Sequence, residues 1–293
     1  MNDLGTIVTA MVTPFDDRGE VDYAEAARLA RWLIERGNDG LVVAGSTGES
    51  QTLDLDERTE LVRAVKAGVG EAAAVIANVG TSDTRASVEG AMRAQAAGAD
   101  ALLAVVPWYN KPTQSGMLAH FGAIADATPL PVIVYNIPGR SVANILPATL
   151  LDLARKHRNV AGVKESSGDL KQIATIVRDR EPGFRVFAGD DHLFLPSLAV
   201  GADGLVGVAT HLNSREFRRM YDAYRAGETG EAACIHSGQL ALIDALFATT
   251  SPIAVKWAMN QMGFKTGPCR LPLDELPDAL ADRLRPLLAA YAG

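Results

Sequence analysis

The amino-acid sequence predicts a (β/α)8 barrel of the TIM type that is followed by a helical extension. Eight short apolar runs alternate with longer amphipathic segments, and about 225 residues is the usual size of such a barrel. The runs are continuously apolar, as expected of parallel strands buried on both faces. The first run ends in Thr13, Pro14 and Phe15. The glycine-rich turn of a doubly wound nucleotide-binding sheet is absent there, which favours the closed barrel.

The first predicted unit is a strand over residues 6–12 and a helix that begins after Asp22. The short carboxylate of Asp22 can accept hydrogen bonds from the free N–H groups of a first helical turn. Gly37 supplies the residue type that commonly ends a helix. Apolar side chains recur between them at the helical period. They are Ala26, Leu29, Ala30, Leu33 and Ile34.

The second to eighth units repeat this order along the chain. Gly98 closes one of the helices, and Pro147 begins another, since proline is tolerated in a first helical turn. The predicted strands cover residues 40–43, 74–78, 101–106, 131–135, 160–163, 185–188 and 204–208. The helices that follow them cover residues 56–68, 83–97, 114–127, from 147 onward, 170–180, 193–200 and 214–225.

The last part of the chain shows helical periodicity alone, over residues 232–246, 253–262 and 278–291. No linker rich in proline, glycine or serine separates it from the preceding part. We therefore predict a barrel domain over residues 1–226 and a helical extension over residues 227–293 that packs on the barrel.

Composition excludes several classes of partner. A net charge of −7 disfavours nucleic acid and anionic membranes, because the electrostatic attraction that drives such binding would be repulsive. No apolar stretch reaches the ~20 residues of a membrane helix, and no basic segment typical of a signal peptide begins the sequence. Cys234 and Cys269 lie far apart, so neither a disulfide framework nor a zinc site is indicated. We expect a cytoplasmic protein.

Polar residues gather where the predicted strands end, and the carboxyl ends of the strands carry the active site of a TIM barrel. Lys164 directly continues the sixth apolar run, although lysine is almost never buried without a function. A desolvated, neutral amine there could form an imine with a ketone. A lysine that turns outward or pairs with Glu165 is the alternative.

The second and fifth strands end in groups suited to a carboxylate ligand. Ser46 and Thr47 lie in a glycine-containing turn whose N–H groups could hold a carboxylate near the start of a helix, although a plain capped turn would look the same. We expect Tyr135 to point into the barrel mouth. Arg140 could bind a carboxylate through two parallel hydrogen bonds, with a surface ion pair as its alternative.

The fourth and seventh strands end in two further motifs. Trp108 and Tyr109 are adjacent aromatics in a loop, which suggests a binding surface, a subunit contact or simple packing. Gly189, Asp190 and Asp191 follow the seventh strand, where two carboxylates would repel a phosphate group. A non-phosphorylated substrate is therefore favoured, and capping of the next helix is the simpler role for the aspartates.

A metal-dependent aldolase would draw its ligands from the same region. Asp190, Asp191, His192 and His211 could in principle supply them. No paired-histidine spacing supports such a site, so no metal is expected.

Five motifs at the strand ends share their order and spacing with a known family. They are GSTGES at 45–50, PWYNKP at 107–112, YNIPGRS at 135–141, GVKESSGD at 162–169 and AGDD at 188–191. SPIAVKWA at 251–258 continues the similarity into the extension, so that it covers nearly the whole chain. The sequence thus resembles the dihydrodipicolinate synthase and N-acetylneuraminate lyase family of class I aldolases.

The resemblance implies that Lys164 forms an imine with pyruvate and that Tyr135 moves protons at the substrate. Ser46, together with Tyr109 from a neighbouring subunit, would relay those protons. It also implies substrate-binding roles for a second set of residues, of which Thr47 and the backbone near Val206 would hold pyruvate. This second set is Thr47, Val206, Arg140 and Gly189.

Arg140 favours the synthase branch, in which the matching arginine binds the carboxylate of aspartate semialdehyde. Ser46, where synthases usually carry threonine, and SGDL at 167–170 are similar to the lyases instead. The resemblance implies condensation of pyruvate with aspartate semialdehyde in lysine and diaminopimelate biosynthesis, by a homotetramer built as a dimer of dimers, without metal or organic cofactor. A related aldolase or dehydratase acting on a 2-keto sugar acid, and a non-catalytic barrel that binds a small acid, are the alternatives.

Feedback inhibition by lysine is expected to be weak or absent. The positions that match the lysine pocket of sensitive relatives are Leu55, Ser82, Ala86 and Trp108. None of these is a carboxylate that could pair with the ammonium group of lysine.

Overall fold

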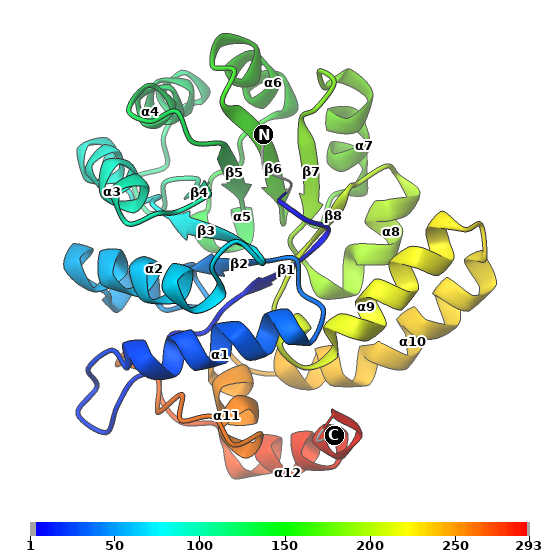
Figure 1. Ribbon diagram of the computed structural model, residues 1–293. Coiled ribbons are helices and arrows are strands. Elements are labelled where there is room, and N and C mark those ends of the chain that lie inside the picture. Colours follow the sequence, from blue (N-terminus) through cyan, green and yellow to red (C-terminus); the bar gives the residue numbers. More distant parts are fainter. Residues whose placement is uncertain (1–3, 292–293) are drawn as a thin grey trace.

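The computed structural model describes residues 4–291 as a closed barrel of eight parallel strands within a ring of helices (Figure 1). Each strand pairs with the next along the chain, and β8 pairs with β1 to close the barrel. The predicted fold is confirmed. Residues 1–3 of the predicted barrel domain and 292–293 of the predicted extension lie outside the described residues. The strands are β1 Ile7–Ala10, β2 Gly40–Val43, β3 Ala74–Asn78, β4 Ala101–Val105, β5 Val132–Asn136, β6 Val160–Glu165, β7 Arg185–Ala188 and β8 Gly204–Gly207.

Helices connect successive strands and three more follow the barrel. Those of the barrel are α1 Tyr23–Glu35, α2 Leu55–Val69, α3 Thr84–Ala96, α4 Gln114–Asp126, α5 Pro138–Ser141, α6 Pro147–Lys156, α7 Leu170–Asp179, α8 Phe194–Ala199 and α9 Thr210–Arg225. Those of the extension are α10 Thr229–Leu246, α11 Ile253–Gln261 and α12 Asp278–Leu288. Short 3-10 helices are η1 Ser50–Thr52, η2 Asp191–Leu193 and η3 Ala289–Tyr291.

Most predicted element limits agree with the structure to within a few residues, because long periodic segments carry a strong signal. The predicted helix cap is confirmed, since the side chain of Asp22 accepts a hydrogen bond from the Glu25 N–H at 2.9 Å. The helix predicted to begin at residue 214 was placed too late. α9 already starts at Thr210, and a kink at Asn213 (φ −126°) interrupts the pattern that the periodicity relied on.

Apart from Arg185 at the start of β7, the strands of the barrel are buried on both faces, which explains the absence of polar alternation in the sequence. One apolar cluster lies between the strands and the surrounding helices, and a second fills the barrel interior. The interior cluster includes Val8, Val42, Ile76, Leu103 and Ile133. The barrel is thus packed with side chains, and its carboxyl end is where a TIM barrel carries its site.

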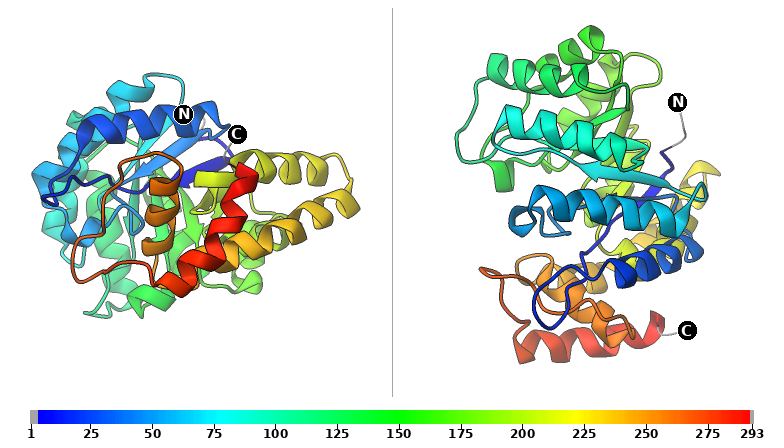
Figure 2. Two further views of the ribbon diagram at one scale, coloured as in Figure 1. Left: turned by 90° about the horizontal axis from the view of Figure 1, so that it is seen from below. Right: turned by 60° about the vertical axis from the view of Figure 1, so that its left-hand side comes forward.

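The extension continues the helical ring rather than standing apart from it. α10 packs on α9, and α11 and α12 gather beside α10 on one side of the barrel (Figure 2). The chain after α11 also reaches α1, where the rings of Trp32 and Phe264 meet edge to face with centroids 4.9 Å apart. The predicted boundary at residue 226 falls in the turn between α9 and α10 and stays a prediction.

Among residues 4–291, none of the helices combines the length and the apolar character that crossing a membrane requires.

Candidate active site

Lys164 and Tyr135 lie side by side inside the barrel. β5 and β6 pair in a register that sets the two residues opposite each other. The Lys164 Nζ atom lies 4.2 Å from the centroid of the Tyr135 ring. Only 5% of Lys164 is exposed, and Phe187 of β7 is its register partner on the other side. The amine therefore lies beside an aromatic ring and is largely shielded from water.

Glu165 does not pair with Lys164, so that alternative is wrong. Successive residues of a strand face opposite sides, and Glu165 points toward the helices. Its carboxylate accepts hydrogen bonds from Asn136 Nδ2 at 3.0 and 3.1 Å, from Gln172 Nε2 at 3.0 Å and from the Ser167 N–H at 2.8 Å. Burial raises the pKa of Glu165, and these hydrogen bonds oppose that rise.

Asn136 and Glu165 are residues whose importance the sequence interpretation missed. Each directly follows a predicted catalytic residue, Tyr135 or Lys164, within a buried strand. Polar residues in that position are a signal that could have been recognised, because buried polar groups require partners. Their hydrogen bonds join the ends of β5 and β6 and so hold the Tyr135–Lys164 pair in place.

Gly189 packs directly against the lysine. A Cβ atom added to Gly189 would lie 1.8 Å from Ser166 Oγ and 3.0 Å from Lys164 Cε. The Gly189 N–H also donates to the Glu165 carbonyl at 2.9 Å. A larger residue would require Ser166 and Lys164 to shift, so Gly189 lies directly beside the predicted catalytic lysine.

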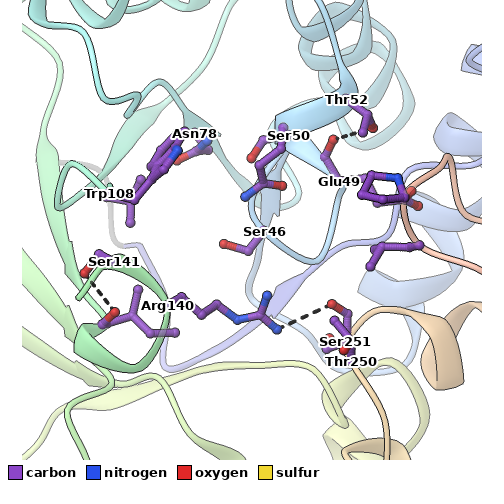
Figure 3. A pocket seen from close by; sticks show the side chains of 15 residues that line it. Ser46, Glu49, Ser50, Thr52, Asn78, Trp108, Arg140, Ser141, Thr250 and Ser251 are labelled. Carbon is purple, nitrogen blue, oxygen red and sulfur yellow. Dashed lines mark hydrogen bonds between the residues drawn. The ribbon is translucent and has the colours of Figure 1, made fainter. Parts of the chain in front are cut away.

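A pocket of about 380 Å³ opens at the carboxyl ends of β2 to β5 (Figure 3). Ser46 enters it from the loop after β2, and Arg140 of α5 crosses it, with Nη2 3.4 Å from the Ser251 carbonyl. Lys164 and Tyr135 do not line this pocket. Val105 does, and it is in register with Tyr135, so the pocket reaches the interior layer beside the lysine.

Part of the pocket wall comes from residues that the sequence interpretation did not name as site residues. Asn78 ends β3, while Thr250, Ser251 and Leu273 belong to the helical extension. Ser251 begins the SPIAVKWA motif, which was the available signal. The extension therefore contributes directly to the mouth of the barrel.

The loop that carries Ser46 and Thr47 does not lead straight into a helix. The short 3-10 helix η1 intervenes, and α2 begins only at Leu55. The expected carboxylate-binding role of this loop stays a prediction. Thr47 is buried, and the Thr13 hydroxyl donates to the Gly48 carbonyl at 2.7 Å. These contacts fix the loop to the end of β1.

Val206 and Tyr109 lie in opposite settings. Val206 is buried on β8 in the interior cluster. Tyr109 is 91% exposed and does not line the pocket, whereas the adjacent Trp108 does. Within one chain, Tyr109 therefore does not reach Lys164. Packing of the loop does not explain a side chain this exposed, so a binding surface or a subunit contact is left as its role.

Two of the four candidate metal ligands, Asp191 and His211, serve other contacts. Asp191 accepts hydrogen bonds from the N–H groups of Val208 and Ala209 at 3.0–3.1 Å, so it links to the loop after β8 rather than capping its own helix. Burial raises the pKa of Asp191 to about 6. His211 Nε2 accepts from the Val12 N–H at 3.2 Å, and burial lowers the pKa of His211 to about 4. Among residues 4–291, no three His, Cys, Asp or Glu side chains converge to hold a metal ion.

Comparison with known proteins decides the family. A model of the Dihydrodipicolinate synthetase family matches residues 3–291. The chain belongs to this family. A 4-hydroxy-tetrahydrodipicolinate synthase of Heliobacterium modesticaldum is 47% identical, with 99% of this chain and 96% of that protein covered.

Solved structures of dihydrodipicolinate synthases agree with the barrel and the extension together. The enzyme of Bacillus anthracis is 41% identical, with a TM-score of 0.96 and 99% of each chain covered. The enzyme of Cyanidioschyzon merolae, whose structure has lysine bound, is 42% identical, with a TM-score of 0.96 and 98% of each chain covered. The family resemblance read from the strand-end motifs is confirmed.

Proposed function

We propose that this member of the dihydrodipicolinate synthetase family is a lyase of the class I aldolase type that condenses pyruvate with aspartate semialdehyde. The product would be 4-hydroxy-tetrahydrodipicolinate, a precursor in lysine and diaminopimelate biosynthesis. The observation that carries the proposal is the contact between Lys164 and Tyr135 at the carboxyl end of the barrel, 4.2 Å from amine nitrogen to ring centroid. The names of the full-length relatives support the same reaction.

In the proposed reaction, the Lys164 amine attacks the ketone carbon of pyruvate and the adduct loses water to give an imine. The imine withdraws electrons, so the methyl group loses a proton and becomes an enamine carbon. That carbon forms a C–C bond with the aldehyde carbon, whose oxygen takes up a proton. The amino group of the semialdehyde then replaces Lys164 at the imine carbon, which closes the ring and frees the lysine.

Tyr135, Ser46 and Tyr109 would carry the protons in these steps. The Tyr135 ring contacts the amine, which puts a phenol beside the reacting carbon. Ser46 lines the pocket at the mouth of the barrel. Its hydroxyl can relay a proton as a threonine would, although it lacks the methyl group that restricts rotation. Tyr109 would act from a neighbouring subunit.

Thr47, Val206, Gly189 and Arg140 would hold the substrates. Arg140 crosses the pocket with its guanidinium group near the Ser251 carbonyl, where its two parallel N–H groups suit a carboxylate. That arrangement favours an acidic aldehyde over a neutral sugar chain as the second substrate.

Four further statements belong to this proposal. The reaction needs no metal or organic cofactor, the enzyme works as a homotetramer in the cytoplasm, and lysine inhibits it weakly or not at all. Activity should survive treatment with EDTA, and light scattering should report four chains. A steady-state titration with lysine should leave the rate nearly unchanged.

The deciding experiment traps the imine. The protein is incubated with pyruvate, reduced with borohydride and digested, and mass spectrometry should place the adduct on Lys164. Absence of that adduct would refute the mechanism. Consumption of aspartate semialdehyde is then measured beside a 2-keto sugar acid such as N-acetylneuraminate. An adduct with turnover of the sugar acid alone would move the assignment to the lyase branch, for which Ser46 is the supporting residue.

A further inference from the structure

A buried ion pair joins the helical extension to the loop after β2. Lys256 of α11 donates from Nζ to Glu49 Oε1 at 2.8 Å and to the Pro268 carbonyl at 2.8 Å. Lys256 is 1% exposed and Glu49 is 3% exposed. The two residues are 207 positions apart in sequence. Lys256 lies within the SPIAVKWA motif, which the catalytic proposal leaves unexplained.

Glu49 belongs to the same short loop as Ser46. Its N–H donates to the Ser46 carbonyl at 3.1 Å, and its own carbonyl accepts from the Thr52 N–H at 3.0 Å. Its backbone is left-handed, with φ 55°, a conformation that is strained for a residue other than glycine. Contacts outside the loop must therefore stabilise this conformation.

Both carboxylate oxygens of Glu49 are bound by the extension. Oε1 accepts from Lys256, and Oε2 accepts from the Arg270 N–H at 2.8 Å. The Arg270 side chain also donates to the Thr52 carbonyl at 2.7 Å, at the far end of the loop. The extension thus holds the loop at its centre and at its end.

Phe15, in the loop after β1, completes this junction. Lys256 Nζ lies 4.1 Å and Arg270 Cζ 4.4 Å from the centroid of its ring. The Phe15 N–H donates to the Thr266 carbonyl at 3.0 Å, and a Cβ on Gly267 would lie 2.1 Å from the Phe15 carbonyl oxygen. Such close backbone approach leaves the extension little freedom to move relative to the loop.

Stability alone is a weak reason for such a pair. Removing an ammonium and a carboxylate from water is unfavourable, and apolar residues of similar size often stabilise a protein as well. Burial lowers the pKa of Lys256, and Glu49 opposes this. A buried pair of this kind is better explained by the single geometry that it imposes on its surroundings.

We propose that Lys256 is a positioning residue that fixes, through Glu49, the loop from which Ser46 enters the pocket. Lys256 touches neither substrate nor reacting atoms. Its effect on turnover rests on the proposed function, because it is exerted through the Ser46 hydroxyl. The effect on the loop itself does not depend on the reaction.

Lys256→Met is the primary variant, since it keeps the length of the side chain and removes the charge. We expect kcat to fall about 10- to 100-fold, as a misplacement of about 1 Å can cause, while KM for pyruvate stays within about 3-fold. Hydrogen exchange of the loop amides of Glu49, Ser50 and Thr52 should accelerate at least ~10-fold. Glu49→Gln combined with Lys256→Met removes both charges and guards against a folding failure caused by one unpaired ion.

A double-mutant cycle with Ser46→Ala separates positioning from general damage. If Lys256 acts through Ser46, adding Lys256→Met to Ser46→Ala should lower kcat less than about 3-fold further. Arg180→Met is the matched control. It removes a partly buried ion pair with Asp203 at the opposite end of the barrel, and it should lower the melting temperature without changing kcat.

Three outcomes would overturn the proposal: an equal loss of kcat with and without Ser46, an equal loss in Arg180→Met, or unchanged exchange of the loop amides in Lys256→Met. Failure of the wild-type chain to convert pyruvate and aspartate semialdehyde would refute the proposed function instead. In that case, hydrogen exchange of the loop amides in Lys256→Met would still test whether Lys256 positions the loop.

Discussion

At the scale of single residues, the site depends on which face of a strand each side chain takes. Lys164 faces the barrel interior and Glu165 faces the helices, because neighbouring residues of a strand alternate. Tyr135 and Asn136 of β5 do the same, and the two pairs are in register. A slip of one residue would exchange the two faces. The hydrogen bonds between Asn136 and Glu165 therefore stabilise the register that brings the lysine to the tyrosine.

Arg140 provides the most direct test of substrate choice. We expect Arg140→Ala to raise KM for aspartate semialdehyde about 10- to 100-fold, since hydrogen bonds to charged groups contribute about 1.5–3 kcal/mol. Trapping of pyruvate on Lys164 should be unaffected. Arg140→Lys keeps the charge but cannot form two parallel hydrogen bonds. Its KM for aspartate semialdehyde should therefore lie between those of the wild type and of Arg140→Ala. A rise in KM for pyruvate instead would place Arg140 at the other substrate.

His211 gives the fold a dependence on pH. Burial lowers its pKa to about 4 from an ordinary value of 6.5, so the unfolded chain takes up the proton first as the pH falls. The contribution of His211 to the free energy of unfolding is complete above pH 6.5 and is lost as the pH falls through about 4. Protonation of Nε2 would also break its hydrogen bond with the Val12 N–H.

His211→Asn should make this contribution visible. The variant does not titrate at this position, so the gap in unfolding free energy between wild type and variant should shrink by about 2 kcal/mol from about pH 7.5 to about pH 4.5. Burial also lowers the pKa of His120 to about 4 and raises that of Asp191 to about 6, but both residues remain in each chain and cancel in the difference. Parallel pH curves from denaturant titrations would contradict the assignment.

At the scale of elements, one set of interactions made by an aspartate recurs three times at the amino-terminal face of the barrel. Asp39, Asp100 and Asp203 each directly precede an even-numbered strand, and each carboxylate accepts a backbone N–H of the strand before it. Each also pairs with a cation from a helix or a helix end, namely Arg218, Lys66 and Arg180. This face carries stability rather than chemistry.

Asp100 is a suitable member to test. Its carboxylate accepts from the Val75 N–H at 2.8 Å and pairs with Lys66 Nζ at 3.0 Å. Asp100→Ala leaves both partners unsatisfied, so we expect a loss of about 2 kcal/mol in unfolding free energy with kcat unchanged. Asp152→Ala removes an exposed pair with Lys156 and should cost less than about 0.5 kcal/mol. Equal losses in the two variants would show that the strand contact contributes little.

The sequence was sufficient for the eight strands, for most of the helices and for the polar residues at the strand ends. β2, β3 and β7 were predicted with their observed limits, and Lys164, Tyr135, Ser46 and Arg140 were placed at strand ends because the barrel rule selects those positions. The path of the loop after β2 could not be predicted. Ala44 and Glu49 have positive φ angles, and Glu49 is bound by Lys256, 207 positions away, a contact that no local pattern encodes. The pocket wall formed by the extension was missed for the same reason.

At the scale of the whole molecule, one chain holds most but not all of the proposed site. Ser46 and Arg140 share the pocket, and Lys164 with Tyr135 lies in the interior layer that the pocket reaches. Tyr109 remains outside, with 91% of its surface exposed and φ 71°. Its exposed ring is therefore available for a contact with another chain, since tyrosine is enriched at interfaces. A neighbouring subunit is the partner that the proposed relay requires.

Complementation between two damaged chains tests this arrangement. Lys164→Ala and Tyr109→Phe chains should each have low activity alone. In a two-fold dimer, mixed assemblies contain one site with an intact Lys164 from one chain and an intact Tyr109 from the other. Random mixing by co-refolding should therefore restore about a quarter of the wild-type sites. If Tyr109 served its own chain, no mixed site would be complete and activity would stay at the level of the separate variants. The recovered kcat per chain distinguishes the two arrangements, whichever surface of the barrel forms the interface.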